Sequence, residues 1–459
     1  MSPSISRQLA RFTLDLQYDD LPEKVVHEVK RYLYDSIGCA FGGYYTKDVQ
    51  LMHKIYRHME GIPEATLLVS GEKMPAVNAT LINSLAIRAL DFNDIYWKED
   101  PSHPSDLIPA ALNAGEMAGS TMKEVIVAIV LAYEFEQRMC HFAVPGVRER
   151  KWHHGTITQF VSPLVAGRLL GLNEDQLVNA VGINGSHNHT IGAPTAGKLT
   201  MMKNTVDPMA VQAGVFAALM AKEGYSGTEE IFEGKEGFMD VYGEGWDLPM
   251  LVDGLGDSFK ILDCSMKAFP TEALTHTHIT ATLSLVKEHD IKPEDIDEVV
   301  ITTIARAADI LFDPHKYEPT GRETADHSLP FCIARAILDR RITTQTFDEE
   351  NISDPRLKDV IYKIKGEASK EFEALFPAKQ PSRVTIRTKD GSEHALYLEY
   401  PKGDPREPMT MDDLVDKFGA LTDPYLTKAG QEQMKENIFY CDTLPGVGHF
   451  MGLMVADRN

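Results

Sequence analysis

The stretch LDFNDIYWKEDPSHPSD, residues 90–106, gathers ionisable side chains between two apolar runs, AVNATLINSLAIRA and LIPAALNAGEMAG. It contains the carboxylates Asp91, Asp94 and Asp106, the amide Asn93 and the imidazole His103. A polar break between buried helices places such groups where a helical core opens, and pKa values there are shifted toward acid–base use. The same residue types also serve structure, because Asp and Asn cap helices and prolines end them. From this segment alone both interpretations stay open.

Histidines supply further acid–base candidates. His103 has an ordinary pKa near neutrality, so it is a candidate acid or base, unless it is a loop histidine with satisfied hydrogen bonds. Residues 151–160, KWHHGTITQF, place two more histidines side by side. Adjacent side chains on a helix or a strand point in different directions, so we expect only one of His153 and His154 to face a ligand directly.

Two lysines are candidates for holding an anion. Lys203 lies in LTMMKNTVDPMAVQAGV, four residues before an apolar helix, and Lys267 lies in CSMKAFPTEALTHTH. Each lysine either extends its stem along apolar surface or binds a substrate anion. Because the net charge of the chain is −22, an anionic substrate is repelled by the overall field and needs a locally positive pocket. His103, His153, Lys203 and Lys267 would supply that charge if they converge.

Motifs for metals and cofactors are absent from the sequence. The five cysteines lie far apart and form no CxxC pair, which argues against structural zinc, an iron–sulfur cluster and a disulfide framework. His187 and His189 lack a carboxylate or a third histidine at ligand spacing. Neither GxGxxG nor a Walker pattern occurs in the first 260 residues. We therefore expect no metal and no cofactor.

Composition excludes several classes of partner. An acidic chain does not bind nucleic acid without a marked basic patch, and the densest cationic string, VRERK at 147–151, is short. No apolar run approaches the roughly 20 residues that a membrane helix needs. The N-terminal stretch has early acidic residues and no continuous apolar segment, so it does not resemble a signal peptide. The unpaired cysteines favour a reducing, cytoplasmic location.

The elements that position these residues are mostly helical in the first 260 residues. Residues 24–43 and 122–143 carry apolar side chains at helical spacing, and Thr121 with Glu124 forms a capping-box start. Residues 207–223 are rich in alanine and nearly apolar, which is typical of a helix buried on most sides.

The pattern changes near residue 265. Residues 292–304 predict a helix start followed by a β-branched strand. Residues 381–401 predict two strands joined at Asp390-Gly391, a hairpin signal. Helices are expected at 327–340 and 354–365, and again beyond residue 404. We therefore expect a mainly α fold with an inserted α+β domain. Residues 1–267 and 404–459 form the large helical domain, and residues 268–403 form the smaller α+β domain.

Seven segments, taken in order, resemble the MmgE/PrpD family. They are YDSIGCAFGG (34–43), LDFND…HPSD (90–106), WHHGT (152–156), the Lys203 segment, GYSGTEEIFEGKEGF (224–238), MKAFPTEALTH (266–276) and ADHSLPF (325–331). Any one of these strings is weak evidence, but seven in the family's order, over nearly the whole chain, are strong evidence. The resemblance implies a large helical domain with the small domain acting as a lid, and a homodimer.

The resemblance also implies a class of reaction. The family includes 2-methylcitrate dehydratases, cis-aconitate decarboxylases and iminodisuccinate epimerases. We expect a metal-independent lyase that removes water from a citrate-like tricarboxylate such as 2-methylcitrate. Decarboxylation of cis-aconitate, or epimerisation or isomerisation of a small dicarboxylate, are the alternatives. A non-catalytic helical scaffold would need none of these side chains to converge.

Site residues follow from the matched motifs. The resemblance implies catalytic roles for Asp91, His103, His153, Lys203 and Lys267, and substrate-binding roles for Asn93, Asp94, His154, His276 and Phe331. Of the two adjacent histidines, His153 matches the family's histidine. The decarboxylases resemble this chain but have a threonine where Ile95 stands and often a tyrosine where Phe331 stands. Neither Ile95 nor Phe331 can donate a hydrogen bond, which favours the dehydratase.

Overall fold

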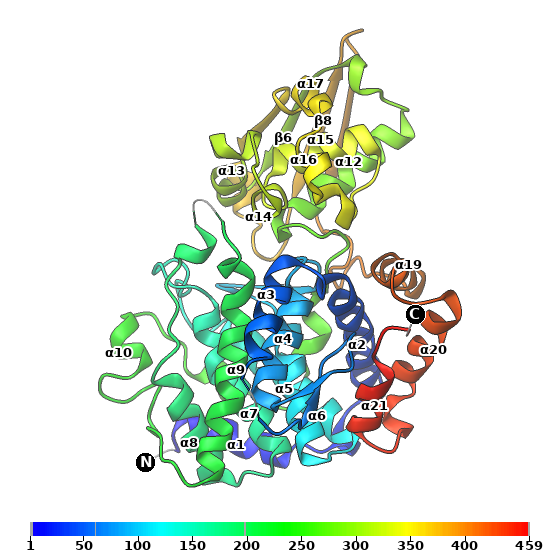
Figure 1. The fold of residues 1–459 in the computed structure, drawn as a ribbon. Helices are drawn as coiled ribbons and strands as arrows, with labels where there is room; N and C mark the ends of the chain where they lie inside the picture. The colour runs from blue at the N-terminus through cyan, green and yellow to red at the C-terminus, as the bar shows by residue number, and fades with distance from the viewer. Residues whose placement is uncertain (1–2, 60, 197–198, 458–459) are drawn as a thin grey trace.

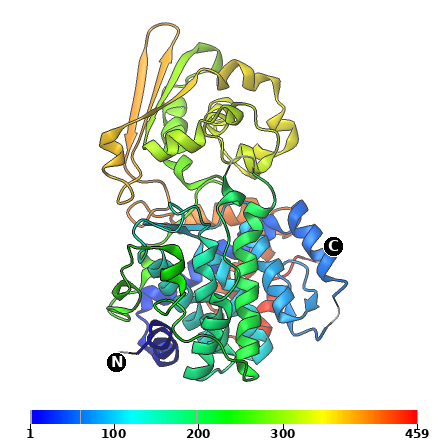
Figure 2. The same ribbon diagram turned by 90° about the vertical axis from the view of Figure 1, so that its left-hand side faces the viewer.

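The buried hydrophobic side chains of the protein form two clusters, which define two lobes (Figures 1 and 2). The computed structural model describes residues 3–59, 61–196 and 199–457. The large lobe has its core in residues 5–266 and 409–454. The small lobe has its core in residues 273–386, with Ile95 and Trp97 of the large lobe packed against it. The fold is mostly α with a smaller α+β part, as the sequence indicates, and the expected domain boundaries stay predictions.

Helices make up most of the large lobe. They are α1 (Ile5–Asp15), α2 (Glu23–Gly43), α3 (Lys47–Tyr56), α4 (Ala76–Arg88), α5 (Ile108–Ala118), α6 (Met122–Met139), α7 (Gly155–Leu169), α8 (Glu174–Gly185), α9 (Met202–Lys222), α10 (Phe238–Tyr242), α11 (Pro249–Val252), α19 (Met411–Thr422), α20 (Lys428–Phe439) and α21 (Val447–Leu453). Short strands join them: β1 (Ala65–Thr66), β2 (Lys73–Met74), β3 (Asp94–Trp97), β4 (Pro101–Ser102) and β5 (Ser265–Met266). No described helix is long and apolar enough to cross a membrane.

The alanine-rich helix α9 packs against α4, α7 and α8 in the middle of this lobe. Its contact with α7 is close, because a Cβ on Gly214 would lie 1.8 Å from the Ser162 hydroxyl. The expected capping box is present at the start of α6, where Thr121 and Glu124 bond each other's backbone. Helix α9 begins at Met202, earlier than expected, so Lys203 lies in its first turn and not ahead of the helix.

A four-stranded sheet forms the centre of the small lobe, in the order β7-β6-β8-β9. Strands β6 and β7 are parallel, and the other pairs are antiparallel. Helices α12 and α15 pack together and against the sheet. The elements are α12 (His276–Glu288), β6 (Ile296–Thr303), α13 (Ala305–Leu311), α14 (Arg322–Ala325), α15 (Leu329–Asp339), α16 (Glu349–Ile352), α17 (Lys358–Ile361), β7 (Ile364–Ala368), α18 (Lys370–Glu373), β8 (Ser382–Thr388) and β9 (Glu393–Leu398).

Most expected elements of the small lobe are found, but the helix over 354–365 is wrong. That segment holds only the short helical turns 355–357 and Lys358–Ile361. At Ile364 the chain enters β7, which pairs in parallel with β6. This pairing joins residues far apart in sequence, so it is invisible to local periodicity. The Asp390-Gly391 hairpin is present, and Gly391 has the positive φ of +89° that the turn needs.

Candidate active site

A small cavity lies between the two lobes, with a volume of about 60 Å³. The large lobe contributes Arg88, Asp91, Ile95, Trp97, Pro101, His103, Arg148, His154, Thr195, Lys203 and Lys267, and the small lobe contributes Glu272, Ala273, Ile310 and His327. Four of these side chains are cations at neutral pH, against the two carboxyl groups of Asp91 and Glu272. The cavity is therefore locally positive inside a protein of net charge −22.

Asp91 lies at the centre of the charges. Its Oδ1 accepts hydrogen bonds from Lys267 Nζ at 2.7 Å and from the Arg88 guanidinium, and its Oδ2 lies 3.1 Å from Lys203 Nζ. Asp91 has a φ of +50°, a strained conformation that Asp tolerates better than most residues. The residue follows the end of α4, so this turn is what directs its carboxylate between the two lysines.

Electrostatics keep Asp91 ionised. Burial alone would raise the pKa of Asp91, but Lys203, Lys267 and Arg88 outweigh burial and hold that pKa well below its ordinary value. Burial also lowers the pKa of Lys267, although Asp91 opposes the shift. Asp91 is thus a fixed anion that holds two lysines in place, and at neutral pH it is too weak a base to remove a carbon-bound proton.

His103 has the geometry of a general base. Its Nδ1 lies 2.7 Å from the backbone carbonyl of Asp94, and a carbonyl only accepts, so Nδ1 carries the proton. Burial, with help from Arg88 and Lys267, lowers the pKa of His103 well below its ordinary value. The ring is therefore neutral, and its Nε2 has a free lone pair at the wall of the cavity.

Asn93 and Asp94 lie behind the cavity wall and hold the His103 segment in place. Asp94 accepts from the Ser105 hydroxyl at 2.6 Å and from the Ser105 backbone N–H at 3.0 Å. Asn93 donates to the Ser105 hydroxyl at 2.9 Å and to Asp106 at 3.0 Å. Neither side chain lines the cavity, although the sequence predicted substrate contact for both; their side chains bond Ser105 and Asp106 instead.

The two adjacent histidines are placed differently from expectation. His154, at the start of α7, lines the cavity with its ring centroid 5.7 Å from that of His103. His153 is completely buried and is not among the lining residues; its Nδ1 accepts the Gly155 backbone N–H at 3.0 Å. The structure thus brings His154 to the cavity in place of His153, because the chain turns into α7 at this point.

A possible metal-binding group lies behind these histidines. Ligand atoms of His153, His154 and Asp207 all lie within 4.8 Å of one another. Three such side chains are enough for a catalytic zinc site in number. However, Arg88 lies 4.0 Å from Asp207, and His154 and His153 hold the pKa of Asp207 well below its ordinary value despite its burial. The positive charge of Arg88 so close to this carboxylate opposes the binding of a divalent cation there.

His276 and Phe331 lie away from the cavity lining. His276 begins α12, where its Nε2 lies 3.3 Å from the Thr271 carbonyl and its ring packs on Phe269. Phe331 is completely buried in the small-lobe core and packs against Phe347. The structure therefore does not bring these two residues, expected to bind substrate, into contact with the cavity.

Four ionisable residues of the cavity were missed by sequence reasoning. Arg88 lies three residues before Asp91, a spacing that brings the two side chains together at a helix end. His327 belongs to the ADHSLPF segment, and its Nδ1 lies 2.5 Å from Asp326 Oδ1. Glu272 follows Pro270 at the entry to the small lobe, and Arg148 lies in the short cationic string. No local pattern marks Glu272 or Arg148, because only the fold carries them to the cavity.

Glu272 has an unusual protonation state. Burial raises the pKa of Glu272 to about 7, although Lys267 and the Leu274 backbone N–H oppose the shift. A carboxyl group that still carries its proton near neutral pH is suited to act as a general acid.

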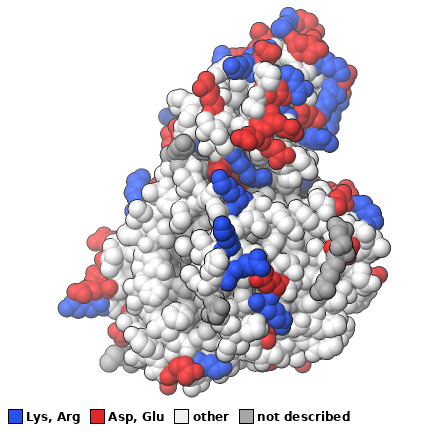
Figure 3. Space-filling model, viewed as in Figure 1, with Lys and Arg blue, Asp and Glu red and all other residues white. Residues whose placement is uncertain are grey.

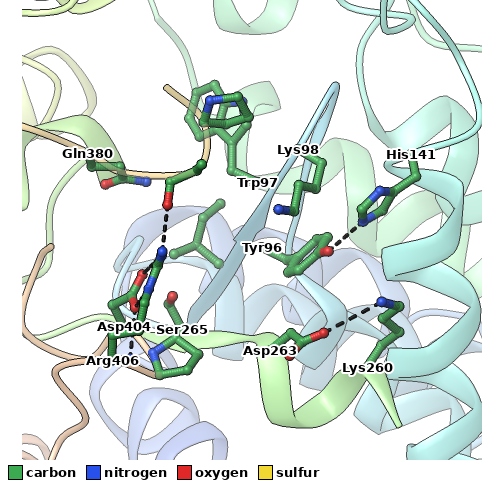
Figure 4. Close-up of a pocket in the computed structure, with 14 residues that line it drawn as sticks. Tyr96, Trp97, Lys98, His141, Lys260, Asp263, Ser265, Gln380, Asp404 and Arg406 are labelled. Atoms are coloured by element: carbon green, nitrogen blue, oxygen red, sulfur yellow. Dashed lines mark hydrogen bonds and ion pairs between the residues drawn. The ribbon is translucent and has the colours of Figure 1, made fainter. Parts of the chain in front are cut away.

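A second, larger cavity of about 440 Å³ lies beside β3 (Figure 4). It shares Ile95 and Trp97 with the first but contains neither Asp91 nor His103. Figure 4 shows Lys260 directed at Asp263, and Arg406 bonded to Asp404. Since the larger cavity lacks the group of Asp91, His103, Lys203 and Lys267, the smaller cavity is the better candidate active site.

Comparison with known proteins identifies relatives over nearly the full length of the chain. The family model of the MmgE/PrpD N-terminal domain matches residues 7–250, and that of the C-terminal domain matches residues 269–441. A cis-aconitate decarboxylase of Mus musculus is 25% identical, covering 95% of this chain and 90% of its own length. A cis-aconitate decarboxylase of Aspergillus terreus is 23% identical (98% and 96% covered), and a 2-methylcitrate dehydratase of Escherichia coli is 24% identical (91% and 90% covered).

Proposed function

Because the chain belongs to the MmgE/PrpD family, we propose that it is a metal-independent lyase that removes water from a citrate-like tricarboxylate such as 2-methylcitrate. Lyases are the activity its named relatives share, whereas the substrate and the bond broken are our proposal. The observation that carries it is the neutral His103, whose unprotonated Nε2 borders a cationic cavity.

In the proposed reaction His103 Nε2 takes a proton from the carbon next to a substrate carboxylate. Negative charge then develops on that carboxylate, where the ammonium groups of Lys203 and Lys267 stabilise it. The bond between carbon and the departing hydroxyl breaks as Glu272 gives its proton to that oxygen, so water leaves and a C=C bond forms. The proton on His103 passes to solvent, and Glu272 takes one back, before the next turnover.

The runner-up reaction is decarboxylation of cis-aconitate, the activity named for several relatives. Two features of this cavity favour the dehydratase. Ile95 provides an apolar wall where the decarboxylase motif has threonine, and Glu272 offers the acid that a departing hydroxyl needs. The argument from Phe331 loses its weight, because that residue lies in the small-lobe core. Epimerisation of a dicarboxylate uses the same base without the acid step.

One assay separates these reactions. Purified protein is mixed with 2-methylcitrate and followed by ultraviolet absorbance, while release of carbon dioxide from cis-aconitate is measured in parallel. We expect a new absorbance band from the conjugated double bond and no carbon dioxide. Rapid release of carbon dioxide from cis-aconitate would replace the dehydratase by the decarboxylase, and no change in either assay would favour the epimerase or a scaffold.

Metal independence belongs to the same proposal, and it has its own test. Dialysis against a strong chelator is expected to leave the rate unchanged, because Lys203, Lys267 and Arg88 already supply positive charge at the cavity. If activity is lost and then restored by zinc or iron, the group of His153, His154 and Asp207 becomes the metal site and the proposed mechanism is wrong.

The small lobe is proposed to act as a lid. A cavity of about 60 Å³ holds only a few water molecules, whereas ligand pockets usually measure about 300–1,000 Å³. A tricarboxylate therefore needs the lobes to separate before it enters. Lys267, at the entry to the small lobe, would meet the bound anion as the lobes close.

We also propose that the protein is a cytoplasmic homodimer. Its five cysteines are all free and buried, as suits a reducing compartment. The exposed sides of α3 and α9 form one apolar face, which we call the α3–α9 face; its large side chains are Leu51, Ile55, Met202, Met209 and Phe216, each between 39% and 56% exposed. Gln212 Nε2 of α9 donates a hydrogen bond to the Tyr56 hydroxyl of α3 at 3.2 Å, which joins the two helices. Figure 3 shows that most of this side of the large lobe is uncharged, although a row of basic side chains crosses it; the uncharged part suits contact with a second copy.

A further inference from the structure

Arg148 differs from the other cations of the cavity in its partners. Arg88, Lys203 and Lys267 each contact Asp91. The guanidinium of Arg148 makes no hydrogen bond or ion pair with any residue that the structure describes, although it lines the same cavity. A guanidinium has five N–H donors and is always charged, so its bonding capacity is unused here.

The backbone of Arg148 is held firmly in place. The carboxylate of Asp100, itself completely buried, accepts the Val147 N–H at 2.7 Å and the Arg148 N–H at 3.0 Å. Gly146 allows this close approach, because a Cβ there would lie 2.6 Å from the Glu99 carbonyl. The loop is thus built to present Arg148 at a fixed point, which reduces the entropy lost when a ligand binds.

The surroundings of Arg148 favour an anion. Burial and the nearby Arg306 lower the pKa of Arg148, and the opposing effects of Glu272, Asp100 and Asp207 do not fully offset them. Glu272, on the small-lobe side of the cavity, carries its proton below about pH 7, because burial raises its pKa to about 7. A partly buried charge that has no partner among the described residues is costly, so a bound anion would relieve this cost.

We propose that Arg148 binds a substrate carboxylate that Lys203 and Lys267 do not hold, so that the cavity recognises at least two carboxylates at separate points. The planar guanidinium can hold a carboxylate through two parallel N–H···O bonds. This inference rests on the proposed function for the class of substrate. It adds a residue that selects polycarboxylates over acids with a single carboxylate.

Calorimetric titration with tricarballylate (propane-1,2,3-tricarboxylate), which lacks a hydroxyl group to lose, tests the inference apart from any reaction. The proteins compared are the wild type, Arg148→Gln, Arg148→Lys and the control Lys151→Gln, which removes one charge three residues away at an exposed position. Arg148→Gln is expected to weaken tricarballylate binding about 10- to 100-fold, as for hydrogen bonds to charged groups. Arg148→Lys should recover part of the loss, and Lys151→Gln should bind as the wild type does.

Thermal unfolding of each variant separates a folding defect from a lost contact, and Arg148→Lys carries the test if Arg148→Gln does not fold. Wild-type affinity in Arg148→Gln, an equal loss in Lys151→Gln, or no binding of tricarballylate to the folded wild type would overturn the inference. Should the protein bind tricarballylate through Arg148 yet dehydrate no citrate-like acid, the subsite stands and the proposed reaction fails. If the protein dehydrates a citrate-like acid but binds tricarballylate equally well without Arg148, the proposed reaction stands and the subsite fails.

Discussion

The hydrogen bond from His103 Nδ1 to the Asp94 carbonyl decides which nitrogen of His103 is free to take a proton. We expect His103→Asn to lower kcat by about 10²- to 10⁴-fold, the usual contribution of a general base. Asparagine keeps a donor for the Asp94 carbonyl, so the thermal unfolding midpoint should change little. The control is His289→Asn on the exposed end of α12, which should keep the wild-type rate. A rate within threefold of the wild type for His103→Asn would remove His103 from the mechanism.

The raised pKa of Glu272 predicts how kcat/KM depends on pH. An acid catalyst must carry its proton, and burial raises the pKa of Glu272 to about 7, so kcat/KM should fall as pH rises through about 7. Protonation of His103 should not lower kcat/KM until the pH is well below the ordinary pKa of histidine, because burial lowers the pKa of His103. Glu272→Gln should lower kcat/KM and abolish the alkaline decline. The exposed Glu288→Gln should keep the wild-type profile; a profile of Glu272→Gln that still declines near pH 7 would assign the acid to another group.

At the scale of elements, the cavity depends on where α4, β3, α9 and the entry to the small lobe meet. Helix α19, which comes after the small lobe in the chain, returns to this junction. Its Lys417 lies 2.6 Å from Asp35 of α2 and donates to the backbone carbonyls of Phe92 and Lys267. One buried ammonium thus joins both ends of the large lobe to the two segments that carry Asp91 and Lys267.

Breaking this junction should cost stability. Lys417→Met leaves the Asp35 carboxylate buried without its cation, and removal of one partner of a buried pair costs about 3–5 kcal/mol. Burial already raises the pKa of Asp35 and Lys417 opposes that shift, so in Lys417→Met the carboxyl group will take up a proton more readily and the loss should shrink as pH falls. Urea unfolding measures both effects. Asp35→Asn combined with Lys417→Met should be more stable than Lys417→Met alone, and the opposite order would contradict this account.

For the whole molecule, the proposed dimer makes a direct prediction. Met202, Met209 and Phe216 recur every seven residues, about two helical turns, so they lie along one side of α9. Phe216→Glu should convert a dimer to a monomer in light scattering after size exclusion, because a carboxylate would have to be buried in an apolar contact. Val241→Glu, at a 64% exposed position on α10, is the matched control and should stay dimeric. If the wild type is already a monomer, the proposed dimer is wrong.

Local patterns in the sequence determined many of the elements and the family. The capping box at Thr121, the Asp390-Gly391 hairpin and the long helices depend on neighbours a few residues away, so periodicity and turn chemistry predict them. The helix over 354–365 failed for the opposite reason, since β7 exists through its pairing with the distant β6. The MmgE/PrpD resemblance is confirmed, because its motifs are short strings that need no fold to be recognised.

Only the tertiary structure decided which of the matched residues share a cavity. It brings together Asp91, His103, Lys203 and Lys267, adds Glu272 and Arg148, and exchanges His153 for His154. Sequence motifs indicate residue types, whereas the direction of a side chain depends on how the chain enters α7 and on what packs behind it. The raised pKa of Glu272 comes from burial, and it is the surroundings of Arg148 that leave its guanidinium without a partner among the described residues. Both depend on distant segments of the chain, which is why one-dimensional patterns carry no trace of them.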